Sequence, residues 1–241
     1  MMNEPPMRET RAVDTLRGVT LERSVAPYAE GSCMVTFGAT RVLCAATVQD
    51  GVPEWRRGGL AGWVTGEYAM LPRSTHRRTG RERNGAGGRT QEIQRLIGRA
   101  LRASMDLMAL GERTIILDCD VLVADGGTRT AAITGACIAL HDACVRLLND
   151  GTIEALPMRE LVAAVSVGII GGEHRLDLDY REDVAADVDL NLVGLQSGRL
   201  VEVQGTAERA SFSEDDLATL LRLGRAGLDR LFGIQRDALG I

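Results

Sequence analysis

Short runs of alternating apolar and polar residues fill positions 19 to 70. The alternation has the period of two that half-buried β-strands require, and tight-turn residues separate the runs. These runs predict a β-meander, and the stretch after it, residues 72–89, loses the periodicity and carries glycine and proline as a loop does. The strand-like runs are VTLERSV (19–25), CMVTF (33–37), RVLCAATV (41–48) and GWVTGEYAM (62–70).

Helical spacing first appears between Ile93 and Met108, where apolar residues recur at intervals of three and four. Thr90 is the expected N-cap of this helix, and Gly111 is the expected stop signal. The run TIILDCDVLV (114–123) then reads as a central strand, because it is almost continuously apolar and β-branched.

The second half of the chain repeats the order of strands followed by a helix. A long helix is predicted over 128–148, with Thr128 as its cap, and two hairpins follow, one over 161–180 around Gly171 and one turning near 197. The last helix begins at Ser213, where a capping-box pattern is present.

The two halves therefore look like a weak internal duplication. No Pro/Ser-rich linker separates them, so we expect one compact α+β domain over 1–241, with a polar extension at 1–10 and an arginine-rich loop at 72–89.

Composition excludes several kinds of chemistry. All 28 basic residues are arginine, so the phosphate-binding lysine of a P-loop and the Schiff-base lysine of pyridoxal enzymes are absent. The formal net charge of -5 argues against a protein that is basic all over, so binding of a polyanion needs a local patch.

Cysteine usage and the lack of targeting signals bear on location. The five cysteines sit in apolar surroundings without metal-site spacing, which predicts buried free thiols and a reducing compartment. The N-terminal residues lack an apolar signal core, and no run reaches the roughly 20 consecutive apolar residues of a membrane span. We expect a cytoplasmic protein without membrane partners.

The segment DGGTRTAAITGA (125–136) places an arginine at the mouth of the predicted helix. Free N–H groups and the positive end of the helix dipole attract anions there, so a cation such as Arg129 is normally unfavourable. An anion held between Arg129 and Arg89 would explain both arginines through charge-assisted hydrogen bonds. The alternative is a capped turn in which Arg129 pairs with Asp118, Asp120 or Asp125.

The loop at 72–89 concentrates positive charge. It contains only one acid, Glu82, and few aromatic residues are available in the chain for base stacking. Such a patch suits recognition of a nucleic-acid backbone, whereas the alternatives are a solvated loop or a subunit contact. Its arginines are Arg73, Arg77, Arg78, Arg81, Arg83 and Arg89.

A cluster of acids follows in DLDYREDVAADVDLN (177–191). Asp177 and Asp179 are expected on one strand face, and Asp183 and Asp189 on either side of a short bend. Carboxylates brought together can hold Mg²⁺ or move a proton in phosphoryl transfer, although acidic hairpin edges commonly just face water.

Seven segments of the chain carry a further signal when they are taken in order: EGSCMVTFGATRVLCAATV, GWVTGEYAMLPRSTHRR, GGRTQEIQRLIGRALRA, LDCDVLVADGGTRTAAITGAC, VAAVSVGI, LDYREDVAADVDLN and VEVQGTAE. Together they resemble the bacterial ribonuclease PH enzymes, in the family's order. The resemblance implies the fold of ribosomal protein S5 domain 2, and phosphorolysis of RNA from its 3′ end with release of nucleoside diphosphates. It also implies trimming of transfer RNA precursors, with ribosomal RNA as a further substrate, and a homohexamer built as a trimer of dimers.

Motif by motif, the resemblance also assigns roles to residues. Asp183 and Asp189 are implied as catalytic carboxylates associated with Mg²⁺; either the metal stabilises the leaving 3′ oxygen or Asp189 supplies its proton. Inorganic phosphate is the implied co-substrate, bound by Arg89, Gly127, Thr128 and Arg129. The implied transfer RNA contacts are Arg73, Arg78 and Arg81.

Three rival functions are compatible with parts of this pattern. A hydrolytic ribonuclease would release nucleoside monophosphates, and a non-catalytic RNA-binding ring subunit would release nothing. A small-molecule kinase would need a phosphate loop with a lysine, which the chain lacks.

Overall fold

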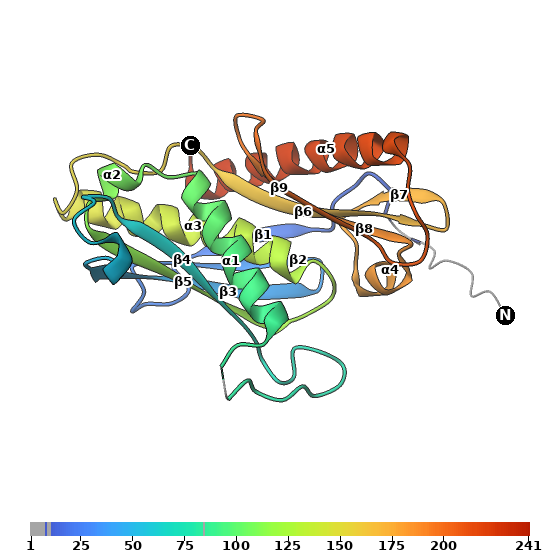
Figure 1. Ribbon diagram of the computed structural model, residues 1–241, viewed down its shortest axis with the longest axis horizontal. Coiled ribbons are helices and arrows are strands. Elements are labelled where there is room, and N and C mark those ends of the chain that lie inside the picture. The colour runs from blue at the N-terminus through green and yellow to red at the C-terminus, as the bar shows by residue number, and fades with distance from the viewer. Residues whose placement is uncertain (1–7, 9–10, 84) are drawn as a thin grey trace.

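Two β-sheets form the framework of the protein (Figure 1). The structure, a computed structural model, describes residue 8 and residues 11–83 and 85–241. In the first sheet the order is β1-β2-β3-β5-β4; only the β4–β5 pair is parallel, and β5 is internal, as expected of the 114–123 run. Its strands are β1 (Val19–Arg23), β2 (Gly31–Phe37), β3 (Thr40–Asp50), β4 (Trp63–Met70) and β5 (Arg113–Val123).

The second sheet is antiparallel throughout, in the order β7-β6-β8-β9. Both predicted hairpins are present: β6 and β7 meet at the turn around Gly171, and β8 and β9 are joined by a turn that includes Gly198. The strands are β6 (Val162–Ile170), β7 (Glu173–Leu176), β8 (Val188–Leu195) and β9 (Leu200–Ala207).

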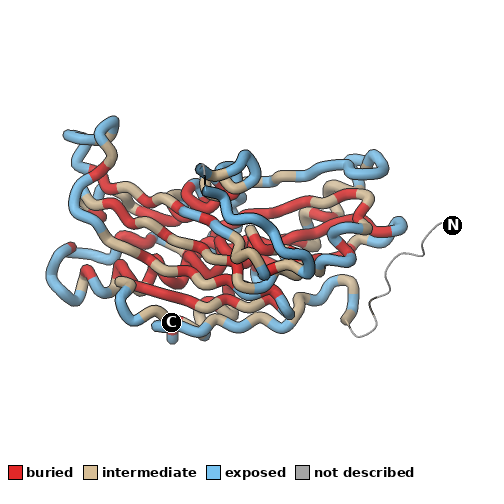
Figure 2. The backbone as a smooth tube through the Cα atoms, turned by 90° about the horizontal axis from the view of Figure 1, so that it is seen from below, coloured by how far each residue is buried: buried red, intermediate tan, exposed pale blue. Residues whose placement is uncertain are grey.

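A long central helix connects the two sheets. α3 contacts β2 and β3 of the first sheet and β6 of the second, and every residue from Thr130 to His141 is buried. Figure 2 shows that the buried backbone, in red, gathers in the interior of the molecule. The helices are α1 (Gly88–Ala103), α2 (Leu107–Leu110), α3 (Thr128–Asn149), α4 (Tyr180–Ala185) and α5 (Glu214–Leu239), with a 3₁₀ turn, η1 (Glu54–Arg56).

α3 is long and apolar enough, by length and composition, to cross a membrane. However, 78% of its most apolar window is buried inside the protein. A helix that is apolar on all sides is expected at the centre of a large core, and both sheets already cover this one.

The start and end of α1 differ from the sequence prediction. Gly87, not Thr90, is the N-cap, and the helix ends at Ala103. Asp106 then caps the separate short helix α2 by accepting the N–H groups of Met108 and Ala109, because its side chain offers those amides a local acceptor. The periodicity joined two helices into one.

Of the predicted caps of the other two long helices, the one at α3 was wrong and the one at α5 is confirmed. At α3 the N-cap is Gly127 in the left-handed conformation, so Thr128 is the first helical residue rather than the predicted cap. At α5 the predicted capping box is confirmed: Ser213 accepts the N–H of Asp216, and the Asp216 carboxylate accepts the N–H of Ser213.

The predicted strand through Tyr180 was wrong. β7 ends at Leu176, Asp177 has φ of 56°, and Asp179 caps α4 in a capping box with Glu182. Asp177 and Asp179 therefore share no strand face, because the chain turns at Asp177 and the capping acceptor starts a helix instead.

One continuous cluster of buried side chains extends through both halves of the chain. It contains all five cysteines, which are free and buried as predicted. The loop between β4 and α1 projects away from this core (Figure 1). Of the polar extension expected at 1–10, only Arg8 lies within the described residues.

Candidate active site

A polar cleft of about 770 Å³ opens at the N-terminus of α3. One wall carries Arg89 at the start of α1 and Arg129 in the first turn of α3, and the other carries Asp183 of α4 and Asp189 of β8. The cleft thus unites the residues that the sequence suggested for phosphate binding with the two suggested carboxylates, although they lie up to 100 positions apart in the chain.

The mouth of α3 is shaped by two glycines with positive φ. Gly126 and Gly127 have φ of 76° and 65°. A Cβ at Gly126 would lie 2.5 Å from the carbonyl oxygen of Leu178 and 2.8 Å from the nitrogen of Tyr180, so only glycine permits this approach. The turn at Gly126 and Gly127 therefore packs directly against the segment that leads into α4.

Arg129 does not pair with any of the three aspartates considered from the sequence. Its Nη1 donates to Oε1 of Gln204 at 2.9 Å and lies 3.5 Å from Oε1 of Glu92. Arg89 makes no hydrogen bond or ion pair through its side chain within the described part of the chain. Both guanidinium groups line the cleft with donors to spare for an anion.

A hydrogen bond from the first sheet holds the side chain of Thr128 in place. Its Oγ1 and the hydroxyl of Tyr68, on β4, are hydrogen-bonded at 2.8 Å, and both side chains are almost fully buried. Burial raises the pKa of Tyr68, so it stays a neutral partner. The first turn of α3 is thereby tied to β4 beneath the cleft.

The two carboxylates of the opposite wall, Asp183 and Asp189, have few partners that offset their negative charge. Burial, and then the neighbouring Asp183 carboxylate, raise the pKa of Asp189 to about 6. Burial also raises the pKa of Asp183, against the opposing influence of Arg89 and Arg129. Oδ1 of Asp189 is buried without a hydrogen-bond partner among the described residues.

This donor set fits a magnesium ion that is completed by the substrate. The described residues contain no cluster of three or more His, Cys, Asp or Glu side chains suited to a metal. Mg²⁺, however, is commonly held by one or two carboxylates together with waters and substrate phosphates. Asp183 and the unpartnered Oδ1 of Asp189 would supply those carboxylates.

The sequence analysis did not identify Arg17, which bonds to residues next to both walls of the cleft. Its Nε and Nη2 donate to the two carboxylate oxygens of Asp177 at 3.0 and 2.7 Å, and its backbone N–H donates to Asp177 at 2.8 Å. The same guanidinium donates from Nη1 to the carbonyl oxygen of Asp125. Arg17 therefore connects the loop before α3 to the turn before α4.

Two further arginines extend this buried network. Arg8 and Arg11 both contact the carboxylate of Glu182, which is buried in α4 beside Asp183. Burial raises the pKa of Glu182, but the hydrogen bond and charge of Arg8 outweigh it and hold that pKa below its ordinary value. The only sequence signal for this network was the excess of arginine in a polar N-terminal segment.

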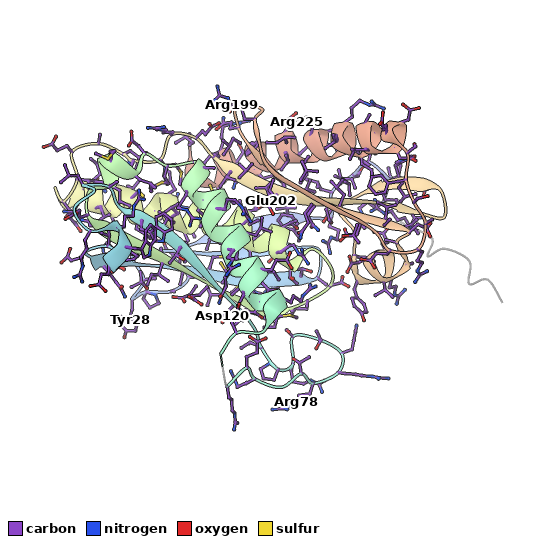
Figure 3. All side chains as sticks on the ribbon, viewed as in Figure 1. Tyr28, Arg78, Asp120, Arg199, Glu202 and Arg225 are labelled. Atoms are coloured by element: carbon purple, nitrogen blue, oxygen red, sulfur yellow. The ribbon has the colours of Figure 1, made fainter. Side chains whose placement is uncertain are left out.

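The suggested RNA contacts lie apart from the cleft. Arg73, Arg78 and Arg81 are exposed on the loop between β4 and α1, and Figure 3 shows Arg78 on the part that projects from the body. Arg73 lines a second cleft next to the first, while Arg78 and Arg81 line neither.

Comparison with known proteins places this geometry in a family. Two models match: the 3′ exoribonuclease family, domain 1, over residues 15–146, and domain 2 of the same family over residues 160–227. The ribonuclease PH proteins of Methylobacterium nodulans and of Methylobacterium sp. strain 4-46 are each 58% identical over 232 residues, covering 95% of this chain and 98% of the relative.

Solved structures of lower identity share the fold. The crystal structure of rice Rrp46 superposes with a TM-score of 0.77 at 22% identity, covering 95% of this chain and 98% of that one. The Archaeoglobus fulgidus exosome with RNA bound to the active site gives a TM-score of 0.79 at 23% identity, covering 92% and 89%. The expected α+β class with a repeated strand-and-helix unit is thus confirmed, and so is the resemblance seen in the sequence motifs: the chain belongs to the ribonuclease PH family of 3′ exoribonucleases.

Proposed function

We propose that this protein is a phosphate-dependent nucleotidyltransferase that shortens RNA from its 3′ end. The observation that carries the proposal is the cleft in which two donor-rich arginines, Arg89 and Arg129, face the carboxylates Asp183 and Asp189. Such a site can hold an inorganic phosphate beside a phosphodiester, and phosphoryl transfer depends mainly on positioning and charge neutralisation.

In this reaction the free phosphate is the nucleophile. Its oxygen forms a bond to the phosphorus that links the last nucleotide to the RNA, and the bond from that phosphorus to the preceding 3′ oxygen breaks. The products are a nucleoside diphosphate and an RNA with a free 3′ hydroxyl. Arg89, Arg129 and the N–H groups of Gly127 and Thr128 at the start of α3 hold the attacking phosphate in line.

The leaving 3′ oxygen develops negative charge, so it must either receive a proton or be stabilised by a nearby positive charge. Asp183 and Asp189 would hold Mg²⁺, which when bound supplies a positive charge near this oxygen. The carboxyl of Asp189 is the other source, because a protonated Oδ1 can donate directly to it. Asp189→Asn removes the transferable proton and one anionic magnesium ligand together, so activity that survives in magnesium but not in chelator assigns this aspartate no proton transfer.

Precursor transfer RNA is the substrate we propose, together with ribosomal RNA 3′ ends. Support comes from the exposed arginine loop: Arg73, Arg78 and Arg81 make no ion pair within the described residues, so their charge is free for a phosphate backbone. The cell compartment that fits these substrates, and the five unoxidised cysteines, is the cytoplasm.

We also propose that the chain works as a homohexameric ring, a trimer of dimers. Large apolar side chains are exposed at the end formed by η1 and α2, where the N–H of Gly62 donates to the carbonyl of Leu107: Trp55 and Leu60 are each 68% exposed and Met108 is 60% exposed. Apolar surface of this kind suits a subunit contact. Light scattering after gel filtration should give six copies, and a monomer would contradict the ring.

Product analysis tests the reaction. Purified protein incubated with a 3′-extended transfer RNA and labelled inorganic phosphate should transfer the label into nucleoside diphosphates. Unlabelled nucleoside monophosphates would instead identify a hydrolase. Release of no nucleotide, with RNA still bound, would support the second candidate, a non-catalytic RNA-binding ring subunit, for which the arginine loop is sufficient.

A further inference from the structure

A second cleft, also of about 770 Å³, lies beside the first on the side of the arginine loop. Thr75, Ala124 and Tyr180 line both clefts, so the two are separated by a shared wall of three side chains. A volume of this size is typical of sites for small ligands or parts of larger ones. The phosphate transfer proposed above takes place in the first cleft.

The shared wall carries an exposed aromatic ring. Tyr180, the first residue of α4, is 48% exposed, and its ring centroid lies 6.3 Å from that of His76 with the planes tilted by 55°. That spacing is too close for a base to enter between the two rings, so a base can stack only on an outer face. In a chain with three tyrosines and two tryptophans, an aromatic surface at a cleft boundary is a scarce feature.

Tyr68 and Trp63 already pack against other side chains. Tyr68 is buried under the first cleft, and Trp63 is packed edge-on against Trp55 and covered by the guanidinium of Arg102 at 4.1 Å. Tyr180 has no such partner on its exposed side apart from His76 in the described residues. Its ring is therefore available to a ligand.

The charges around the second cleft suit an RNA strand. Arg73 and Arg181 line it and make no side-chain hydrogen bond or ion pair within the part of the chain that the structure describes. Asp179 uses Oδ1 to accept the N–H groups of Arg181 and Glu182, which leaves Oδ2 as an acceptor toward the cleft. Arginines for phosphates and a carboxylate for ribose hydroxyls are the groups that contact RNA without reading its sequence.

We propose that the second cleft is the subsite for the nucleotide on the 5′ side of the scissile bond, with its base stacked on Tyr180. The inference rests on the proposed phosphorolysis, because the attacking phosphate and the terminal nucleotide then occupy the first cleft. The remaining strand must leave past the shared wall toward the arginine loop. Tyr180 is a positioning residue that aligns the substrate without contacting the reacting atoms.

Kinetics of Tyr180→Ala test this assignment. Stacking of a base on an aromatic side chain corresponds to about a tenfold change in affinity, so KM for a short single-stranded oligoadenylate should rise about tenfold. KM for phosphate and the inhibition constant of ADP should not change, because ADP occupies only the phosphate and terminal-nucleotide positions. Tyr180→Phe keeps the ring and should restore the wild-type KM.

Tyr28→Ala is the matched control. Tyr28 is 96% exposed, and Figure 3 shows it at the opposite end of the molecule from α4, which Figure 1 labels. The control should leave every constant unchanged. An unchanged KM for oligoadenylate in Tyr180→Ala would overturn the subsite, and so would an equal rise in the ADP inhibition constant, since the ring would then belong to the terminal nucleotide.

A binding measurement separates failure of the subsite from failure of the proposed reaction. An oligonucleotide with 2-aminopurine in the penultimate position should lose fluorescence on binding to the wild-type protein, because the base stacks on Tyr180. The quenching should persist in Tyr180→Phe and vanish in Tyr180→Ala whether or not nucleoside diphosphate is released. Equal quenching in all three proteins would refute the stacking.

Discussion

The arginines of this protein are buried and paired in one region and exposed and unpaired in another. Near the N-terminus, Arg8 and Arg17 are almost fully buried, with side chains 6% and 7% exposed, and each is paired with a buried carboxylate. On the loop between β4 and α1, Arg73, Arg78 and Arg81 are exposed and make no ion pair with a described residue.

The difference teaches that the number of positive charges says little about binding. A buried arginine with matched acceptors fixes the geometry of the chain, since removing one partner leaves an uncompensated charge. An exposed and unpaired arginine contributes almost nothing to stability but remains available to a polyanion. Arg129 combines both features, being largely buried yet facing the cleft.

Arg17→Ala should give the largest effect. It strips Asp177 of its main partner inside the protein, and the expected loss is about 3–5 kcal/mol of unfolding free energy. Chemical denaturation measures it. The matched control is Arg23→Ala. The Arg23 side chain pairs with Asp142 but is 36% exposed, so a loss of about 1 kcal/mol or less is expected. Equal losses in both variants would remove the distinction between buried and exposed pairs.

Arg129→Ala should abolish most phosphate-dependent activity while the fold stays intact. Loss of one preorganised charged donor typically lowers kcat by about 10²–10³-fold. Phosphorolysis rates and a thermal melt measure the two properties. Arg146 lies at the other end of the same helix and pairs on the surface with Asp150, so Arg146→Ala should change neither property. Full activity of Arg129→Ala with RNA and phosphate would contradict the proposed phosphate site.

Glu182→Gln should reveal the buried network through pH. Because the folded-state pKa of Glu182 is lowered, its charge stabilises the protein above its unfolded-state pKa of about 4.3, and this contribution disappears as pH falls through the folded-state value. The wild type should therefore exceed the variant in unfolding free energy at pH 7, and the gap should shrink below about pH 4. A gap independent of pH would show that charge is not the cause.

Arg78→Ala should have the smallest effect and leave stability unchanged. Removing one phosphate contact should weaken RNA binding at all sequences and reduce the slope of log affinity against log salt by about 0.7–1. Titrations at several salt concentrations measure that slope. Arg199, which Figure 3 shows on the opposite edge of the molecule, supplies the control: Arg199→Ala should keep the wild-type slope.

The sequence alone was sufficient for most elements and for the family. Strand and helix periods follow from local burial, so the hairpins, the central strand and the capping box at Ser213 were predictable. The glycines and the arginine in DGGTRT predict an anion site, because the N-terminus of a helix has free N–H groups whatever surrounds it. The errors came at the N-caps of α1 and α3, at Asp106, whose side chain caps a separate helix, and at Asp177, where the chain turns.

Only the tertiary structure brought the two walls of the cleft together. Nothing local in the sequence places Asp183 and Asp189 opposite Arg89 and Arg129; that follows from packing α3 between both sheets. The contact of Arg17 with Asp177 spans 160 positions of the chain, and such a pairing leaves no periodic trace. The raised pKa of Asp189 has the same origin, because burial and a neighbouring charge exist only after the chain has folded.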